Sequence, residues 1–186
     1  MEKRYTRDSE QKIQSIYTAF IELINVTGYE NLTARQIAER AQISVGTIYH
    51  YFSKGKPAIA AALYEKNLLE TLNINSITGY QYDDLETQIK RHLELHKQNK
   101  ELYRAFDQAI YSHSDFFSGV KRKRDQVLSE QLGDSDPSKL QDIMLVYLTV
   151  DAIIHKHLFV EPLFESDTEL VEYLTKIAET MYGFPQ

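Results

Sequence analysis

The residues of this 186-residue chain best suited to chemistry lie near its N-terminus, where rings with polar tips are followed by basic side chains. Tyr49, His50 and Tyr51 stand in succession, and Lys54 and Lys56 come shortly after them. Hydroxyl, imidazole and ammonium groups can donate hydrogen bonds to phosphate oxygens, and such contacts position a protein on DNA. Packing of the same rings within the protein is the alternative. We favour contact with DNA because of the elements that precede these residues.

Two short helices joined by a turn are expected to position these side chains. Thr33 can cap the first helix, and Gln36 three residues later completes a capping box. Residues 41–43 make the turn, and Ser44 can cap a second helix predicted over Val45–Tyr51. In a helix-turn-helix, the second helix lies in the major groove of DNA and the first helix braces it.

The first turn of the second helix is expected to approach DNA closely. Val45, Gly46 and Thr47 are small, and the free amides at a helix start attract phosphate. Thr47 can also bond to a base edge, and its methyl group can touch a thymine. Ile48 and Phe52 are expected to face inward. The predicted DNA-binding residues are Thr33, Arg35, Ser44, Val45, Gly46, Thr47, Tyr49, His50, Tyr51, Lys54 and Lys56.

The sequence around these helices resembles the TetR (tetracycline-repressor-like) family of transcriptional regulators. The resemblance runs from the lead-in AFIELINVTGYENLT through IAERAQISVGTIYHYF and into the following lysines. It implies a homodimer that binds a palindromic operator in double-stranded DNA and is released by a small molecule. One position departs from the family pattern. The family usually has a lysine three residues after the position of Phe52, whereas this chain has Gly55 with Lys54 and Lys56 on either side, and either lysine can replace that contact.

Apolar residues recur at helical spacing along almost the whole chain, and no alternating strand pattern is present. Gly28 is expected to end the first helix, Pro57 to lie in the first turn of the fourth, and Asp115 and Ser166 to cap later ones. In addition to the two short helices, the predicted helices cover residues 8–27, 57–74, 84–98, 100–112, 116–132, 138–160 and 167–182, with loops at 76–82 and 133–137.

The predicted fold class is therefore all-α. Residues 1–53 are expected to form an N-terminal three-helix helix-turn-helix domain. By the resemblance, residues 54–186 form a C-terminal helical domain for effector binding and dimerisation. The last two predicted helices are apolar over more than one face, which is typical of helices that serve both a core and a partner. Dimerisation would place two recognition helices about 34 Å apart, so that they meet successive major grooves.

Aromatic residues between positions 102 and 117, together with polar residues on the long helix near position 150, are candidates for an effector pocket. An ordinary core with locally satisfied tyrosines is the alternative. The expected ligand is hydrophobic or amphipathic, such as a fatty-acyl compound, an aromatic or a drug-like cation, and it must bind one conformation better than the other. The candidate pocket residues are Tyr103, Phe106, Ile110, Tyr111, Phe117, Tyr147, Asp151 and His155.

Other candidate sites are weaker. His92 and His96 are four residues apart, a spacing that can bind a metal, but we expect them to be exposed and solvated, and we expect no metal or cofactor. The basic run at 121–124 can touch DNA or an anionic ligand, although a solvated helix face is the simpler interpretation. We find no glycine-rich phosphate loop, nucleophile elbow or paired carboxylates, so we expect no enzyme.

Composition narrows the class of protein. The chain has no cysteine, which excludes disulfides and thiolate metal sites. Residues 1–56 carry eight Lys and Arg against six Asp and Glu, a net charge of +2, whereas residues 57–186 carry thirteen against twenty-one, a net charge of −8. A DNA-binding head on an acidic body fits that asymmetry. With no signal peptide or membrane span, we expect a cytoplasmic protein.

Two alternatives stay open at this point. One is a helical ligand-binding or enzymatic protein that does not bind DNA, and the other is a constitutive DNA-binding protein without an effector. The sequence does not choose between repressor and activator, nor does it identify the operator.

Overall fold

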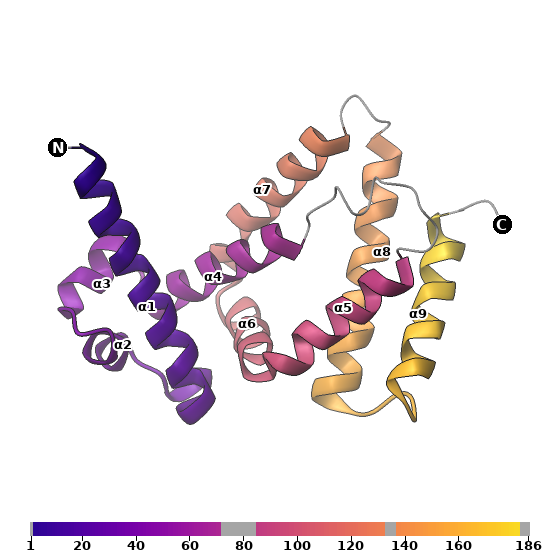
Figure 1. Ribbon diagram of the computed structural model, residues 1–186, viewed down its shortest axis with the longest axis horizontal. Helices are drawn as coiled ribbons and strands as arrows, with labels where there is room; N and C mark the ends of the chain where they lie inside the picture. Colours follow the sequence, from indigo (N-terminus) through magenta and orange to yellow (C-terminus); the bar gives the residue numbers. More distant parts are fainter. Residues whose placement is uncertain (1, 72–84, 133–136, 183–186) are drawn as a thin grey trace. The chain divides into compact units, whose positions relative to one another are not determined.

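Every element that the computed structural model describes, over residues 2–71, 85–132 and 137–182, is a helix (Figure 1). The predicted all-α fold class is confirmed. The predicted loop at 76–82 lies outside the described residues, as do residues 133–136 of the predicted loop at 133–137, whose last residue, Pro137, begins α8. The helices are α1 (Glu2–Asn31), α2 (Ala34–Arg40), α3 (Val45–Tyr51), α4 (Lys56–Thr71), α5 (Leu85–Gln98), α6 (Lys100–Ser112), α7 (Ser114–Leu132), α8 (Pro137–His155), the π-helical turn η3 (Lys156–Val160) and α9 (Asp167–Tyr182).

The chain divides into two compact units. The first combines Met1–Leu68 with Glu101–Arg122, and the second combines Leu69–Lys100 with Lys123–Gln186. The start of α4 thus lies in the same unit as the helix-turn-helix. The predicted boundary after residue 53 stays a prediction.

The helix-turn-helix surrounds an apolar centre made by α1, α2 and α3. Phe20, Ile37 and Ile48 are each fully buried, one from each helix. The spacing of apolar residues along α1 directs one stripe toward the two short helices. Gly28 has φ of 71°, a left-handed conformation that favours glycine, and α1 is interrupted there before its last turn reaches Asn31.

The rest of the first unit is held together by aromatic side chains. The ring of Tyr64 on α4 meets Phe106 on α6 edge-on at 5.4 Å and Phe117 on α7 at 5.6 Å. Such edge-to-face pairs add to the stabilisation that burial alone provides.

The predicted start of the helix near residue 116 is wrong in detail. Helix α7 begins at Ser114, so Asp115 lies in its first turn and is not its cap.

The second unit packs α5, α8 and α9 around a common apolar core, and we call these three helices the C-terminal bundle. The predicted cap of α9 is confirmed, because the amide of Glu169 donates to the hydroxyl of Ser166 at 3.2 Å. Lys97 on α5 also pairs with Asp167 at the start of α9 at 2.5 Å. The core residues are Ile89, Leu93, Val150, Ile154, Leu170, Val171 and Leu174.

No helix within the described ranges combines the length and the apolar character needed to cross a bilayer.

Candidate nucleic-acid interface

Local hydrogen bonds fix the two helices of the helix-turn-helix. The hydroxyl of Thr33 accepts from the amide of Gln36 at 3.2 Å, and the Gln36 side chain accepts from the amide of Thr33 at 2.9 Å. Ser44 accepts from the amide of Thr47 at 3.0 Å. The predicted capping box, the second cap and the turn between them are therefore confirmed. Gln42 in that turn has a φ of 56°.

The inner face of α3 is anchored by two apolar residues, as the sequence predicts. Ile48 is fully buried, and Phe52 directly after the helix is 7% exposed. The ring of Phe52 lies 5.8 Å from that of Tyr17 on α1. This packing fixes the rotation of α3, so that the remaining side chains of the helix face outward.

The outer face of α3 carries most of the predicted DNA-binding residues. Tyr49 is 50% exposed, and Gly46 and His50 are also exposed. The ring of His50 meets that of Tyr51 at 4.9 Å. The hydroxyls of Ser44 and Thr47 lie 2.8 Å apart at the start of the helix. This face combines an open helix N-terminus with hydroxyl and imidazole groups, which suits it to contact a phosphate backbone and base edges.

Gly55 explains the departure from the family pattern. Its φ of 64° lies in the left-handed region, and its amide donates to the carbonyl of Phe52 at 2.7 Å. A Cβ atom at this position would meet Cε1 of Tyr49 at 3.2 Å. Glycine therefore lets the chain turn sharply into α4 while the ring of Tyr49 lies against it.

The two lysines beside Gly55 differ in their surroundings. Lys54 is exposed. The ammonium of Lys56 instead donates to the carbonyl of Tyr29 at 2.7 Å and to that of Glu30 at 3.3 Å, and it lies 4.3 Å from the centre of the Tyr29 ring. Burial lowers the pKa of Lys56, while the nearby Glu30 opposes that shift. Lys56 thus binds the end of α1, and a DNA contact by Lys54 fits the structure better.

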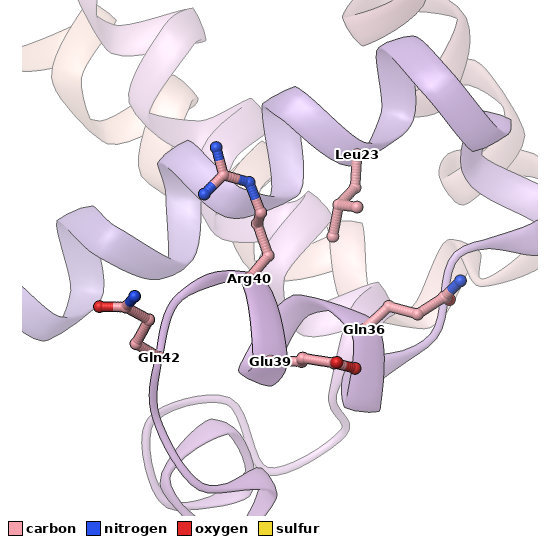
Figure 2. A pocket seen from close by; sticks show the side chains of 5 residues that line it. All are labelled: Leu23, Gln36, Glu39, Arg40 and Gln42. Carbon is pink, nitrogen blue, oxygen red and sulfur yellow. The ribbon is translucent and has the colours of Figure 1, made fainter.

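The supporting helix α2 adds a positive side chain and a surface hollow. Arg35 is exposed at its start, as a phosphate contact requires. Arg40 pairs with Glu22 on α1 at 2.7 Å. Figure 2 shows the hollow, which has a volume of about 370 Å³ and contains none of the predicted effector residues. Its lining is formed by Leu23, Gln36, Glu39, Arg40 and Gln42.

The predicted effector residues fall into both units. In the first unit, Tyr103, Phe106 and Phe117 are buried, and their rings pack against one another or against Tyr64. Tyr111 is 88% exposed. The ring packing fits the alternative of an ordinary core, whereas Tyr111 is too exposed to belong to a core. The pocket stays a prediction.

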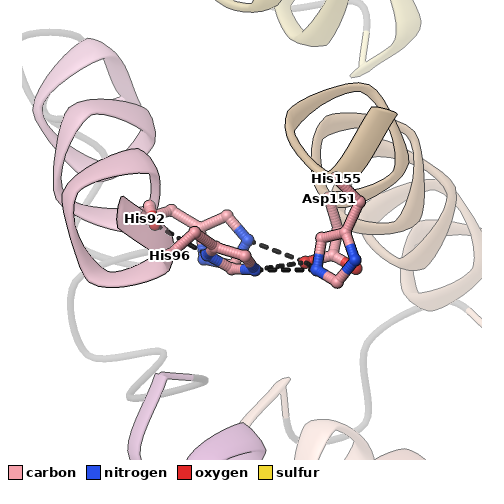
Figure 3. Close-up of polar contacts among 4 residues, drawn as sticks. All are labelled: His92, His96, Asp151 and His155. Atoms are coloured by element: carbon pink, nitrogen blue, oxygen red, sulfur yellow. Dashed lines mark hydrogen bonds and ion pairs between the residues drawn. The ribbon is translucent and has the colours of Figure 1, made fainter. Parts of the chain in front are cut away.

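In the second unit, Asp151 and His155 take part in a cluster that the sequence interpretation missed (Figure 3). The expectation that His92 and His96 are solvated is wrong, because they are 9% and 0% exposed. Nε2 of His92 lies 2.9 Å from Oδ1 of Asp151, and Nε2 of His96 lies 2.9 Å from Nε2 of His155. Tyr147 borders the cluster, with its ring 5.7 Å from that of His92.

The charge state of this cluster follows from its burial and its bonds. Burial lowers the pKa of His96, although Asp151 opposes the shift. Burial by itself would raise the pKa of Asp151, but the hydrogen bond from His92 and the neighbouring imidazoles hold that pKa far below its usual range. Asp151 is therefore a carboxylate facing imidazole nitrogens. The i, i+4 spacing of Asp151 and His155 repeats that of His92 and His96, and this repeat was the sequence signal for the cluster.

Comparison with known proteins finds a family match over the helix-turn-helix. Residues 16–63 match the sequence model of the bacterial regulatory proteins of the tetR family. No curated protein sequence is significantly similar to the chain.

Solved structures share the fold over nearly their whole length. A TetR transcriptional regulator from Rhodococcus sp. RHA1 is 17% identical, with a TM-score of 0.72 over 97% of this chain and 99% of that one. A TetR-family regulator from Streptomyces coelicolor is 22% identical, with a TM-score of 0.64 over 92% and 98%. The multidrug binding protein EbrR, complexed with imidazole, is 16% identical, with a TM-score of 0.65 over 94% and 97%. Residues 16–63 thus match the model of the tetR family, and the chain shares its helical fold with solved TetR-family regulators.

Proposed function

We propose that the protein is a homodimeric repressor that binds a palindromic DNA operator through α3 and leaves it when a small molecule occupies the C-terminal part of the chain. The observation that carries the proposal is the outer face of α3. Tyr49, His50 and Gly46 are exposed there, above Ile48 and Phe52, which are buried. Regulators of this family are generally not enzymes, and the proposed function includes no catalysis.

Selection of bound sequences from random DNA, followed by titration at several salt concentrations, tests the DNA contacts. Tyr49→Ala and Lys54→Ala should weaken specific binding. Loss of one phosphate contact at Lys54 should also reduce the slope of log affinity against log salt by about 1. Lys100→Ala, at an exposed lysine outside the matched domain, is the control. Unchanged affinity and salt dependence in both variants would remove α3 from the interface.

Dimerisation is supported by exposed apolar residues on the last two helices. On α8, Leu145 and Leu148 are 46% and 45% exposed, three residues apart on one face. On α9, Tyr173 and Met181 are also exposed. Each helix thus has an outward apolar stripe besides the one that enters the core, which is typical of a subunit interface.

Analytical ultracentrifugation tests the dimer. Leu148→Glu should shift the protein toward monomers, because a carboxylate would be buried without a partner in the interface. Arg91→Glu adds a carboxylate at an exposed position of α5 and should leave the assembly unchanged. A monomeric wild-type protein at micromolar concentration would rule out the dimer.

The proposed effector is hydrophobic or amphipathic, with fatty-acyl compounds as the first candidates. Support comes from EbrR, a protein of similar fold that is described as a multidrug binding protein. Native mass spectrometry of the purified protein should detect a co-purified ligand, and adding that ligand should release the operator.

A constitutive DNA-binding protein without an effector is the second candidate. It is favoured by the edge-on packing of Tyr64 against Phe106 and Phe117, because side chains that fill a core leave less room for a ligand. This candidate predicts that DNA affinity does not respond to fatty-acyl, aromatic or cationic drug-like compounds. Release of DNA by any of these classes would exclude it.

A further inference from the structure

The strongest feature outside the proposed function is the cluster formed by His92 and His96 on α5 with Asp151 and His155 on α8. We propose that these four side chains bind one divalent transition-metal ion, with Zn²⁺ as the preferred ion. The site lies wholly within the C-terminal bundle and does not depend on the DNA-binding proposal.

The distances between the ligand atoms suit a single ion. The ligand atoms of His92, His96 and Asp151 all lie within 4.8 Å of one another. From Oδ1 of Asp151, Nε2 of His92 lies at 2.9 Å, that of His96 at 3.4 Å and that of His155 at 3.8 Å. A tetrahedral site with bonds of about 2.0–2.1 Å has ligand atoms about 3.3 Å apart. The side chains therefore need only small shifts to surround an ion.

The tautomer of His96 also supports a metal site. Its Nδ1 lies 2.8 Å from the carbonyl of His92, which can only accept a hydrogen bond, so Nδ1 carries a proton. In the neutral ring, Nε2 then has no proton, and its lone pair of electrons faces Asp151 and His155. A histidine whose second nitrogen donates to a backbone carbonyl is the usual arrangement of a metal ligand.

Burial of these polar side chains costs free energy, and a bound metal ion would offset that cost. His96 is fully buried, and Ile89 and Leu93 on the same helix belong to the apolar core. The side chain of Asp151 is 27% exposed, which leaves a path for an ion from solvent. A π-helical turn, Lys156–Val160, follows His155 directly. Such turns frequently occur at functional sites.

The donor set selects the class of ion. Three imidazole nitrogens and one carboxylate oxygen suit Zn²⁺ and related first-row ions, whereas Mg²⁺ and Ca²⁺ prefer oxygen ligands throughout. The carboxylate also supplies a negative charge for the cation. With four protein ligands the coordination shell would be closed, as in sites that stabilise a structure.

A hydrogen-bond network without an ion is the competing explanation. His155 could donate to Nε2 of His96, and His92 could donate to Asp151, which leaves each of these contacts satisfied. Such a network would hold α5 against α8 by itself. It predicts no dependence of stability on metal, and this difference makes the two explanations separable.

Titration of the untagged full chain with zinc chloride, after dialysis against a chelator, tests the site. Calorimetry should show one equivalent bound per chain, and zinc should raise the melting temperature. Cobalt(II) should give the absorption bands of a tetrahedral N/O site. Asp151→Asn and His155→Gln should each weaken zinc binding by more than about 100-fold, because removal of a group outside the first coordination shell already costs about 10–100-fold.

His50→Gln, at an exposed histidine of the other unit, is the matched control and should bind zinc as the wild type does. Circular dichroism of each metal-free variant shows whether it is folded, and Asp151→Asn keeps the size of the side chain if His155→Gln fails to fold. Wild-type protein that binds no zinc, or folded variants that bind it unchanged, would overturn the proposal in favour of the metal-free network.

Discussion

The helix-turn-helix and the C-terminal bundle both rest on buried apolar side chains, but they place their polar groups in opposite ways. Around α3, the hydroxyls of Thr33 and Ser44 bond to amides three residues away, and the remaining polar groups face outward. In the bundle, His92 and His96 lie inside and meet residues 59 positions away. The helix-turn-helix exposes its polar groups on a surface, whereas the bundle encloses them. Substitutions in the two regions should therefore affect stability and binding differently.

The largest effects are expected from the two apolar cores. Phe20→Ala should lower the free energy of unfolding by about 3–5 kcal/mol, and Leu174→Ala by about 2–5 kcal/mol, because each removes a fully buried side chain and leaves a cavity. Chemical denaturation followed by tyrosine fluorescence measures both. Val26→Ala, at a residue 84% exposed, should change little. Equal, small effects at both core positions would contradict the packing described here.

Gly46, in the first turn of α3, and Gly55, directly before α4, should separate stability from DNA binding. Gly55→Ala should cost about 1–2 kcal/mol, because alanine is strained at positive φ. Gly46→Ala should instead stabilise the helix by about 0.5–1 kcal/mol, since its Cβ would meet only Ser44 Oγ at 3.5 Å. Gly46→Ala should nevertheless weaken DNA binding by crowding the surface of α3. Thermal melts and operator titrations of the same samples check both, and a stable Gly46→Ala protein with full affinity would move the interface elsewhere.

Removal of a cap should have a smaller effect. Ser44→Ala should lower the free energy of unfolding by about 0.5–2 kcal/mol, because the amide of Thr47 loses its acceptor. Ser44→Asp should restore most of that loss, since aspartate is also a good cap. Urea denaturation of the three proteins measures the series. If Ser44→Asp proves no more stable than Ser44→Ala, the cap does not stabilise α3.

The smallest effect is expected at Tyr29, whose buried hydroxyl has no hydrogen-bond partner within the described part of the chain. Burial raises the pKa of Tyr29 to about 12 from an ordinary value of 10.0. The folded state therefore resists ionisation, and this residue makes the protein less stable as the pH rises from about 10 toward 12. Tyr29→Phe should be neutral or slightly stabilising at pH 7 and should gain stability relative to the wild type above pH 10. Denaturation at pH 7, 10 and 11 tests this, and a parallel loss in both proteins would exclude Tyr29 as the cause.

The helix-turn-helix and the buried face of α3 were predictable from local sequence. Thr33, Gln36 and Ser44 predict their caps because a cap depends on residues three apart, and Ile48 and Phe52 predict the buried face because helical spacing fixes it. The all-α class followed for the same reason, since each helix carries its own apolar period.

Contacts between residues far apart in the sequence depend on how the helices pack. His92 and His96 were expected in water, and the packing of α5 against α8 instead encloses them with Asp151 and His155. Packing also places the ammonium of Lys56 on the carbonyls that end α1, which its spacing from Lys54 does not predict, and a DNA contact by Lys56 stays a prediction. Side-chain spacing shows which residues share a helix face. What that face meets depends on how the helices pack, and local sequence does not encode this.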